Sequence, residues 1–308
     1  MVSVLLFPGQ GAQKVGMAKD LADAFPAARE VLGAIDAALD QPVTRVMWDG
    51  PEEDLQQTEN AQPAILAHSA AVLAVVGERL GTVAGAAGHS LGEYCAYMAA
   101  GSLTPVSAAQ LVRTRGQLMR DAGRERPGAM AAVLGLVSQE VERICRDAST
   151  GGETVVAANL NTADQTVISG DPSAVTRAGE ACKAAGAKRV QPLKVSGAFH
   201  SPLMAPAAEG LRKVLESTEF RDPQFPVVAN TTAEPVRTAS EGRRWLGEQL
   251  TAPVRWMQCV QRLALLGQDA RFIEVGPGSV LGGLLKRILP SPRYLSLGTA
   301  AEVERFIA

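Results

Sequence analysis

The chain has 308 residues, of which 46% are hydrophobic, and this length predicts one large domain or two unequal domains with a full core. Its 30 Lys and Arg against 32 Asp and Glu leave a net charge of −2, which argues against electrostatic binding to nucleic acid or to an anionic membrane. The cysteines, Cys95, Cys145, Cys182 and Cys259, lie far apart without a CxxC pair, which gives neither a disulfide framework nor a zinc ligand set. These features indicate a soluble globular protein of the reducing cytoplasm.

The chain opens with an apolar run, Val2 to Phe7, that stops at Pro8 and Gly9. The run is too short for a signal peptide or a membrane span, so we expect a buried strand. A glycine-rich turn and a helix-compatible stretch follow it, and this alternation predicts an α/β layer. The next expected elements are helices over 22–39 and 63–80, a buried strand over 82–87, and helices over 93–100 and 107–122.

The pattern changes between residues 126 and 196. Short strands and helices are expected there in the order βαββαβ, over 129–136, 138–148, 154–160, 165–169, 172–185 and 188–195. This order is typical of a ferredoxin-like unit, which closes its own small sheet with two helices on one face. We therefore predict a ferredoxin-like subdomain over 126–196, inserted into a large α/β-hydrolase-like subdomain made of 1–125 and 197–308.

Alternating elements resume after the insertion. The expected elements are a helix over 206–216, a strand over 226–229, helices over 243–250 and 255–266, and a strand over 271–275 that runs into Gly276-Pro277-Gly278. The large layer is thus expected to be split around the inserted unit.

The segment Gly88-His89-Ser90-Leu91-Gly92 matches the GxSxG pattern of a nucleophile elbow. In such an elbow a tight turn between strand and helix strains the serine backbone, and the flanking positions must be small to let the chain pass. The serine Oγ then projects outward, close to NH groups that can receive a developing oxyanion. A structural turn can match this pattern by chance, but its place between an expected strand and an expected helix favours a nucleophile.

A serine hydroxyl needs a base, and the chain has three histidines, His68, His89 and His200. His68 lies within an expected helix, where a core or surface role is favoured. His89 is adjacent to the serine and is expected to support the turn with its ring pointing away from Oγ. His200 lies in a loop-like segment after the insertion, and such loops often carry catalytic bases.

The sequence leaves open which group orients the base. Asp269 and Glu274 are candidates by residue type alone. The alternative is a backbone carbonyl that accepts the second NH of the imidazole, which would give a catalytic dyad.

Several motifs are spread in order over nearly the whole chain. They are FPGQGAQ (7–13), QPAI (62–65), GHSLGEY (88–94), RGQLM (115–119), the segment 159–170, the segment 197–204, PVRW (253–256) and EVGPG (274–278). Together they resemble the malonyl-CoA:acyl carrier protein transacylase family and the related acyltransferase domains of polyketide synthases. A set of motifs in the right order is far more specific than any one of them.

The resemblance implies that Ser90 is the nucleophile, that His200 is the general base, and that the backbone NH groups of Leu91 and Gln10 form the oxyanion hole. It also implies that Arg115 binds the free carboxylate of the acyl group. A planar guanidinium can pair with a carboxylate through two parallel hydrogen bonds, and an uncharged acyl group would leave it unpaired. Taken alone, Arg115 would be read as a solvated helix arginine.

Residues beside the expected site indicate the acyl group. Within the family, Leu91 after the serine and Phe199 before the histidine are associated with malonyl, whereas methylmalonyl enzymes tend to have Gln and Ser there. Asn159 and Asn161 match a segment that faces the cleft, although asparagine is equally suited to turns. Arg255 replaces a glutamine of some members, in a segment whose main chain is thought to orient the histidine, and we favour a backbone contact that the change leaves intact.

The resemblance implies a ping-pong acyl transfer in which a malonyl ester on Ser90 links coenzyme A to the phosphopantetheine thiol of acyl carrier protein. Neither a metal nor a redox cofactor is needed. The alternatives are an acyl hydrolase that clears carrier proteins, a transferase for another carboxylated unit such as methylmalonyl, and a noncatalytic module that docks carriers. The sequence does not distinguish fatty acid from polyketide biosynthesis.

The expected partners are acyl carrier protein and a coenzyme A thioester, with no nucleic acid and no membrane, and a monomer is the default. Carrier proteins are generally acidic, so their docking face should include basic residues. The weak candidates are Lys183, Lys188, Arg189, Lys286 and Arg287.

Overall fold

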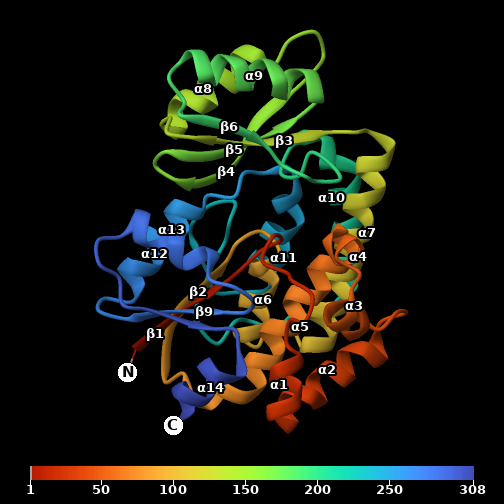
Figure 1. Ribbon diagram of the computed structural model, residues 1–308, viewed down its shortest axis with the longest axis vertical. Helices are drawn as coiled ribbons and strands as arrows, with labels where there is room; N and C mark the ends of the chain where they lie inside the picture. Colours follow the sequence, from red (N-terminus) through yellow and green to blue (C-terminus); the bar gives the residue numbers. More distant parts are fainter. Residues whose placement is uncertain (1) are drawn as a thin grey trace.

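The computed structural model describes residues 2–308, and it is a mixed α/β protein with a larger and a smaller sheet (Figure 1). The strands of the larger sheet are β1 (Val2–Phe7), β2 (Thr82–Gly88), β7 (Val227–Val228), β8 (Pro235–Val236), β9 (Arg271–Val275) and β10 (Tyr294–Leu297). Their spatial order is β10-β9-β1-β2-β7-β8. Neighbours pair in parallel except for β7 with β8.

Strand β1 lies between β2 and β9, and helices cover both of its faces. Leu5 and Phe7 point into one core with the long helices of the first part of the chain, whereas Val4 and Leu6 point into a second core with the C-terminal helices. A parallel strand that is buried on both faces has no polar side, which explains its nearly unbroken apolar sequence. The strands expected over 2–7 and 271–275 are confirmed with the same bounds.

Helices surround the larger sheet. They are α1 (Lys19–Ala24), α2 (Pro26–Ala38), α3 (Val43–Asp49), α4 (Glu52–Gln56), α5 (Thr58–Val76), α6 (Gly92–Ala99), α7 (Pro105–Glu125), α10 (Ala205–Ser217), α11 (Ala239–Glu248), α12 (Trp256–Leu266), α13 (Val280–Ile288) and α14 (Ala300–Ile307). Short 3-10 turns are η1 (Gly77–Arg79), η2 (Pro202–Met204) and η3 (Gln249–Thr251). The helices α3, α4, α13 and α14 and the strands β8 and β10 were not predicted from the sequence.

The helix expected over 22–39 is wrong in one respect, because the structure has two helices there. Phe25 adopts an extended conformation between α1 and α2, and Pro26 is the first residue of α2. The ring of a proline disfavours the helical conformation in the residue before it, so the chain breaks at Phe25 and restarts in a new direction.

Helix α5 with η1, Thr58–Arg79, is long and apolar enough to cross a membrane by length and composition, but 72% of its apolar window is buried inside the protein. Its polar residues also have partners in the core, since His68 Nε2 hydrogen-bonds the carbonyl of Gly298 at 2.8 Å. Burial lowers the pKa of His68 to about 4, so this histidine is neutral. Of the core and surface roles left open for His68, the structure shows the core role, and α5 is a core helix.

The smaller sheet is made of β3 (Ala129–Leu134), β4 (Val155–Thr162), β5 (Gln165–Gly170) and β6 (Arg189–Pro192), with the helices α8 (Ser138–Ala148) and α9 (Pro172–Ala184). Its order is β4-β5-β3-β6, and the pairs are antiparallel. Figure 1 shows α8 and α9 on the face that points away from the larger sheet. Val133, Val141 and Ile168 belong to a separate core between this sheet and its helices.

Backbone contacts fasten the smaller sheet to the larger unit. Leu160 N donates to Val254 O at 2.9 Å, and Val254 N donates to Ala158 O at 2.8 Å. On the other side, a Cβ added to Gly128 would lie 2.6 Å from the backbone nitrogen of Ala198, so only glycine fits where the two connecting segments cross. These joints hold the two sheets on either side of a cleft.

Candidate active site

The predicted elbow is present between β2 and α6. Ser90 has φ 53, in the left-handed region that non-glycine residues rarely adopt. A Cβ on Gly88 would lie 1.8 Å from the backbone of Gly92, and a Cβ on Gly92 would lie 2.2 Å from the carbonyl oxygen of Phe7. Both glycines of the pattern are therefore required by close backbone packing, and the expected strand, turn and helix are confirmed.

His200 lies against Ser90, with 2.7 Å between Oγ of Ser90 and Nε2 of His200. Its other ring nitrogen, Nδ1, lies 2.9 Å from the backbone carbonyl oxygen of Gln249. Because a carbonyl can only accept, Nδ1 carries the hydrogen and Nε2 is left to accept a proton from the serine. The sequence predicts that these two side chains share one site, and the structure brings them into contact.

The group that orients the base is thus a backbone carbonyl, and Asp269 and Glu274 are wrong candidates. Glu274 instead accepts hydrogen bonds from the backbone of Leu281 and Gly282 and from Tyr294. The expectation that the segment around Arg255 supplies the carbonyl also needs correction.

The carbonyl comes from Gln249 in η3, and Arg255 is bonded elsewhere, through its backbone N to Asn230 O and through Nε to Thr231 O. The replacement of glutamine by Arg255 therefore leaves this contact to His200 intact.

Arg115 on α7 is 1% exposed, and its guanidinium lies against Ser90 and the side chain of Gln249. One terminal nitrogen donates to Ser90 Oγ at 3.1 Å and to Gln249 Oε1 at 3.0 Å, and the other donates to Gln62 Oε1 at 2.6 Å. Its Nε is buried without a hydrogen-bond partner, and within residues 2–308 its guanidinium forms no ion pair. Because no carboxylate contacts this buried cation directly, the position suits a negatively charged ligand.

The directions of these hydrogen bonds fix the proton of Ser90. The guanidinium of Arg115 can only donate to Oγ, so the serine hydroxyl directs its own hydrogen to Nε2 of His200. Burial, followed by the positive charge of Arg115, lowers the pKa of His200 to about 3. The imidazole is therefore neutral and ready to accept the serine proton.

These groups line a cleft of about 680 Å³ between the two sheets. Every residue that sequence analysis assigned to the site lines this cleft, namely Gln10, Ser90, Leu91, Arg115, Asn159, Asn161, Phe199 and His200. The smaller unit adds Met130, Val167, Leu193 and Lys194 to the wall. The cleft combines a nucleophile, a base and a cation within one concave surface, which is the arrangement that acyl transfer to serine requires.

The loop after β1 packs directly on the elbow. His89 N donates to Phe7 O at 2.9 Å, and a Cβ on Gly9 would lie 2.4 Å from His89 O. Gln10 follows in this loop and lines the same cleft as Ser90, and its side chain accepts a hydrogen bond from Thr58 Oγ1 at 2.8 Å. The loop is thus fixed at both its main chain and its side chain.

His89 supports the turn as expected. Its Nε2 hydrogen-bonds Asn161 Oδ1 at 2.9 Å, and its ring packs on Trp256 with 5.5 Å between centroids. Asn161 therefore holds the elbow from the smaller sheet, in addition to lining the cleft. Asn159 lies on the same strand and forms a backbone bridge with Val254, so both asparagines lie in strand β4 and not in a turn.

A buried polar network lies behind the site and was not predicted from the sequence. Gln249 Nε2 donates to Ser90 O and to Glu93 Oε2, and the side chain of Asn230 links Ser90 N to Gly88 O. Glu93 and Gln62 lie within motifs that the sequence displays, but Gln249 has no motif of its own. The backbone carbonyl of Gln249 orients His200. Because every residue has such a carbonyl, the residue type gives no signal for this role.

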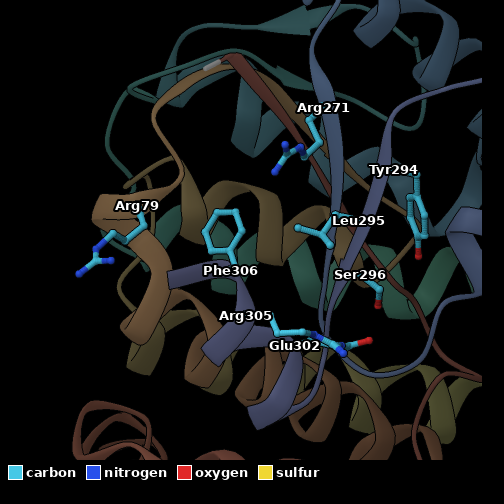
Figure 2. Close-up of a pocket in the computed structure, with 8 residues that line it drawn as sticks. All are labelled: Arg79, Arg271, Tyr294, Leu295, Ser296, Glu302, Arg305 and Phe306. Carbon is cyan, nitrogen blue, oxygen red and sulfur yellow. The ribbon is translucent and has the colours of Figure 1, made fainter. Parts of the chain in front are cut away.

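A second hollow, of about 530 Å³, lies beside β10 and α14 (Figure 2). It contains Arg79, Arg271 and Arg305, but in Figure 2 their guanidinium groups point in different directions and do not meet at one point. Arg79 donates to the carbonyl of Ile307. Across residues 2–308 no cluster of three or more His, Cys, Asp or Glu is placed to hold a metal ion.

Comparison with known proteins gives one consistent result. The chain matches the family model described as an acyl transferase domain over residues 4–304. A malonyl CoA-acyl carrier protein transacylase of Bacillus subtilis (strain 168) is 42% identical over 283 residues, which are 92% of this chain and 89% of the relative. One of Staphylococcus aureus (strain MRSA252) is 40% identical over 302 residues, 98% of this chain and 97% of the relative.

Solved structures agree with these relatives. A type II PKS acyl-carrier protein in complex with its malonyl-transacylase includes a chain with a TM-score of 0.94 and 41% identity, and the match covers 99% of both chains. An acyl carrier protein S-malonyltransferase from Vibrio cholerae O1 biovar eltor has a TM-score of 0.92 and 41% identity, with 98% of both chains covered.

Proposed function

The chain belongs to the malonyl-CoA:acyl carrier protein transacylase family, and on this basis we propose which of its residues perform the reaction. The protein is an acyl-carrier-protein S-malonyltransferase, which moves a malonyl group from coenzyme A to acyl carrier protein. The observation that carries the assignment of residues is the 2.7 Å contact between Ser90 and His200 beside the buried guanidinium of Arg115.

In the first half-reaction, Oγ of Ser90 attacks the thioester carbonyl of malonyl-CoA as Nε2 of His200 takes the serine proton. The backbone NH groups of Gln10 and Leu91 donate hydrogen bonds to the oxyanion that forms. Collapse of this intermediate breaks the C–S bond, and the leaving thiolate receives the proton from Nε2. A malonyl ester on Ser90 remains.

In the second half-reaction, the phosphopantetheine thiol of the carrier gives its proton to Nε2 of His200 and attacks the ester. The C–O bond breaks, Ser90 recovers the proton, and the carrier leaves with the malonyl group. Acyl transfer between sulfur and oxygen changes no oxidation state, and these groups supply the acid, the base and the nucleophile. The proposed reaction therefore uses neither a metal nor a redox cofactor.

Arg115 holds the free carboxylate of the malonyl group throughout both halves. Its buried Nε and its contact with Ser90 Oγ support this role, because a carboxylate that pairs with the guanidinium places the acyl carbonyl near the nucleophile. An acyl hydrolase that clears carriers would have no need of such a cation. The buried charge therefore favours the transferase over the hydrolase and over a noncatalytic docking module.

Phe199 and Leu91 favour malonyl over methylmalonyl as the acyl group. Phe199 is 6% exposed and lines the cleft directly before His200 in the sequence, so its ring limits the space for an α-methyl branch. One methyl group contributes about 1 to 3 kcal/mol of discrimination, so the preference is graded and not absolute.

The carrier approaches across the mouth of the cleft on the side of β6. Leu193, Lys194 and Val280 line the cleft, and Leu193 and Val280 are 37% and 56% exposed. Apolar contacts for the pantetheine chain and a positive charge for an acidic carrier are therefore found together. Among the basic candidates from sequence, Arg287 is already paired with Asp164 at 2.6 Å.

The two sheets support a division into two subdomains. We propose that residues 126–196 form a ferredoxin-like subdomain inserted into an α/β-hydrolase-like subdomain of residues 1–125 and 197–308. The βαββαβ order, the antiparallel sheet and the separate core support the first, and the parallel sheet with a serine elbow supports the second. All the groups of the site come from one chain, so a monomer is sufficient for activity. The unpaired cysteines support a location in the reducing cytoplasm.

Intact-protein mass spectrometry tests the proposed residues. Mixing the protein with malonyl-CoA should add one malonyl group, and peptide mapping should place it on Ser90. The Ser90→Ala variant should not be labelled, whereas Ser107→Ala, which removes a half-buried hydroxyl at the start of α7, should be labelled like the parent. Labelling of Ser90→Ala, or an unmodified Ser90 in the parent, would contradict the assignment.

A further inference from the structure

Glu93 is a buried carboxyl that the proposed reaction does not use. It lies in the first turn of α6 and is 0% exposed. Its Oε2 accepts hydrogen bonds from Asn230 N at 3.1 Å and from Gln249 Nε2 at 2.7 Å, but its Oε1 is buried with no hydrogen-bond partner among the described residues. Half of this carboxyl is therefore poorly stabilised as an anion.

Glu274, the other glutamate at 0% exposure, provides a contrast. Both of its oxygens have partners, since Oε1 accepts from Leu281 N and Oε2 accepts from Gly282 N and from the hydroxyl of Tyr294. Glu274 is fully hydrogen-bonded as a structural carboxylate, whereas Glu93 depends on a nearby charge.

A single amide joins Glu93 to that charge. The side chain of Gln249 accepts from Arg115 through Oε1 at 3.0 Å and donates to Glu93 through Nε2 at 2.7 Å. The negative oxygen end of the amide dipole faces the cation, and the positive NH2 end faces the carboxyl. Each charge therefore favours the other, and the low dielectric of the interior strengthens this interaction between Arg115 and Glu93. Arg115 and Glu93 thus form a buried charge pair that is bridged by Gln249.

The other titratable groups around Glu93 do not carry charge. They are Tyr94 and Tyr97 on α6 and Cys259 on α12, and burial raises the pKa of each to values at which it stays neutral. Burial raises the pKa of Glu93 to about 7, and the positive charge of Arg115 opposes that rise. Any event that neutralises Arg115 therefore favours a proton on Glu93.

We propose that Glu93 is the counter-charge of Arg115 in the free protein and takes up a proton from solvent when the carboxylate of the acyl group pairs with Arg115. This inference rests on the proposed role of Arg115. Without the proton, two carboxylates would share one buried guanidinium, so protonation of Glu93 preserves the charge of the site. The proton returns to solvent when the malonyl group leaves on the carrier.

The coupling has a defined sign. Because binding of the carboxylate takes up a proton, affinity for malonyl-CoA falls as the pH rises through the range in which Glu93 ionises in the free protein. Acetyl-CoA has the same nucleotide and the same phosphates but no carboxylate. Its binding should therefore take up no proton at Glu93, which makes it the reference ligand.

Isothermal titration calorimetry in two buffers of different ionisation enthalpy measures this uptake. We would titrate malonyl-CoA and acetyl-CoA into the Ser90→Ala protein, which binds without transfer, at about pH 7.5. We expect the malonyl enthalpy to change with the buffer, corresponding to uptake of up to one proton beyond that of acetyl-CoA. Glu93→Gln in the same background should bind malonyl-CoA without this uptake, whereas Glu274→Gln should retain it.

A second measurement does not depend on the folding of Glu93→Gln. At about pH 5 the free protein already carries the proton on Glu93, so the uptake by the Ser90→Ala protein should disappear. Malonyl-CoA binding without extra uptake at the higher pH, or uptake that persists in Glu93→Gln, would overturn the inference and leave the proposed function intact. Equal affinity for acetyl-CoA and malonyl-CoA would instead overturn the role of Arg115.

Discussion

The cleft at Ser90 and the hollow beside α14 are similar in size, and both contain arginine, but they differ in how firmly their side chains are held (Figure 2). In the cleft, Arg115 is buried and bonded to Gln62, Gln249 and Ser90, groups that come from three different parts of the chain. In the hollow, Arg305 is exposed and projects beside Glu302. A cavity with charged residues becomes a reactive site only where burial and several partners fix each group in one geometry.

The largest expected effect concerns the base of the cleft. His200→Ala should lower the rate of serine acylation by about 10²- to 10⁴-fold, because the proton of Ser90 loses its acceptor. Rapid-quench labelling with malonyl-CoA measures this rate. His68→Gln is the matched control, since His68 is equally buried but bonds only a backbone carbonyl near α14, and it should acylate at the parental rate. A small effect of His200→Ala would contradict the proposed mechanism.

Removal of the cation comes next. Arg115→Ala should lower kcat/KM for malonyl-CoA by roughly 10²- to 10³-fold, because the carboxylate loses its charged partner. The value for acetyl-CoA should change far less, so the ratio of the two substrates is the measurement. Arg113→Ala on the same helix is the control, since Arg113 bonds Glu59 O and Asn60 outside the cleft. An equal loss for both substrates would point to a structural role for Arg115.

Two buried histidines, His200 in the cleft and His68 in the core near α14, predict that the folded protein loses stability in acid. Burial lowers the pKa of His68 to about 4 and that of His200 to about 3, from 6.5 in the unfolded chain. Below pH 6.5 the unfolded state binds these protons and the folded state does not, so the two histidines lower stability as the pH drops from 6.5 toward 4. Glu93, whose pKa burial raises to about 7, acts in the opposite direction over this range and offsets part of the loss. Each histidine contributes a loss of about 3 kcal/mol at the lower end.

Urea unfolding across this pH range measures the effect. His68→Gln should flatten the pH dependence, and it provides the cleaner comparison because it leaves the cleft intact. A profile of His68→Gln that is as steep as that of the parent would show that His68 does not contribute.

Selectivity for the acyl group should show a smaller effect. Phe199→Ser opens space beside His200 and should raise the ratio of methylmalonyl to malonyl transfer by about 10- to 100-fold. Competition between the two thioesters for one carrier, followed by mass spectrometry of the carrier, gives the ratio. Phe220→Leu is a suitable control, because Phe220 is as buried as Phe199 but packs against Tyr97 away from the cleft.

Local chemistry explains which parts of the site could be predicted from sequence. The elbow was predictable because close backbone packing at Gly88 and Gly92 allows only glycine, so the structural constraint can be recognised from the residues at these two positions. Gln249 was not predictable, because the carbonyl that orients His200 is common to all residues and depends on where η3 lies in the fold. Pro26 indicates a helix break at Phe25, but the apolar periodicity continues across it, and for that reason a single helix was predicted over 22–39.

The smallest expected effect concerns the hollow beside α14. Arg271→Ala and Arg305→Ala remove the guanidinium groups of the hollow that bond no protein acceptor in residues 2–308. Acylation and transfer rates should remain within twofold of the parent, and stability should change by less than about 0.5 kcal/mol, as is usual for surface positions. Steady-state transfer and urea unfolding measure both. A loss of transfer in either variant would mean that the hollow contributes to function. It would also mean that exposed arginines with few hydrogen-bond partners do not by themselves identify an inactive cavity.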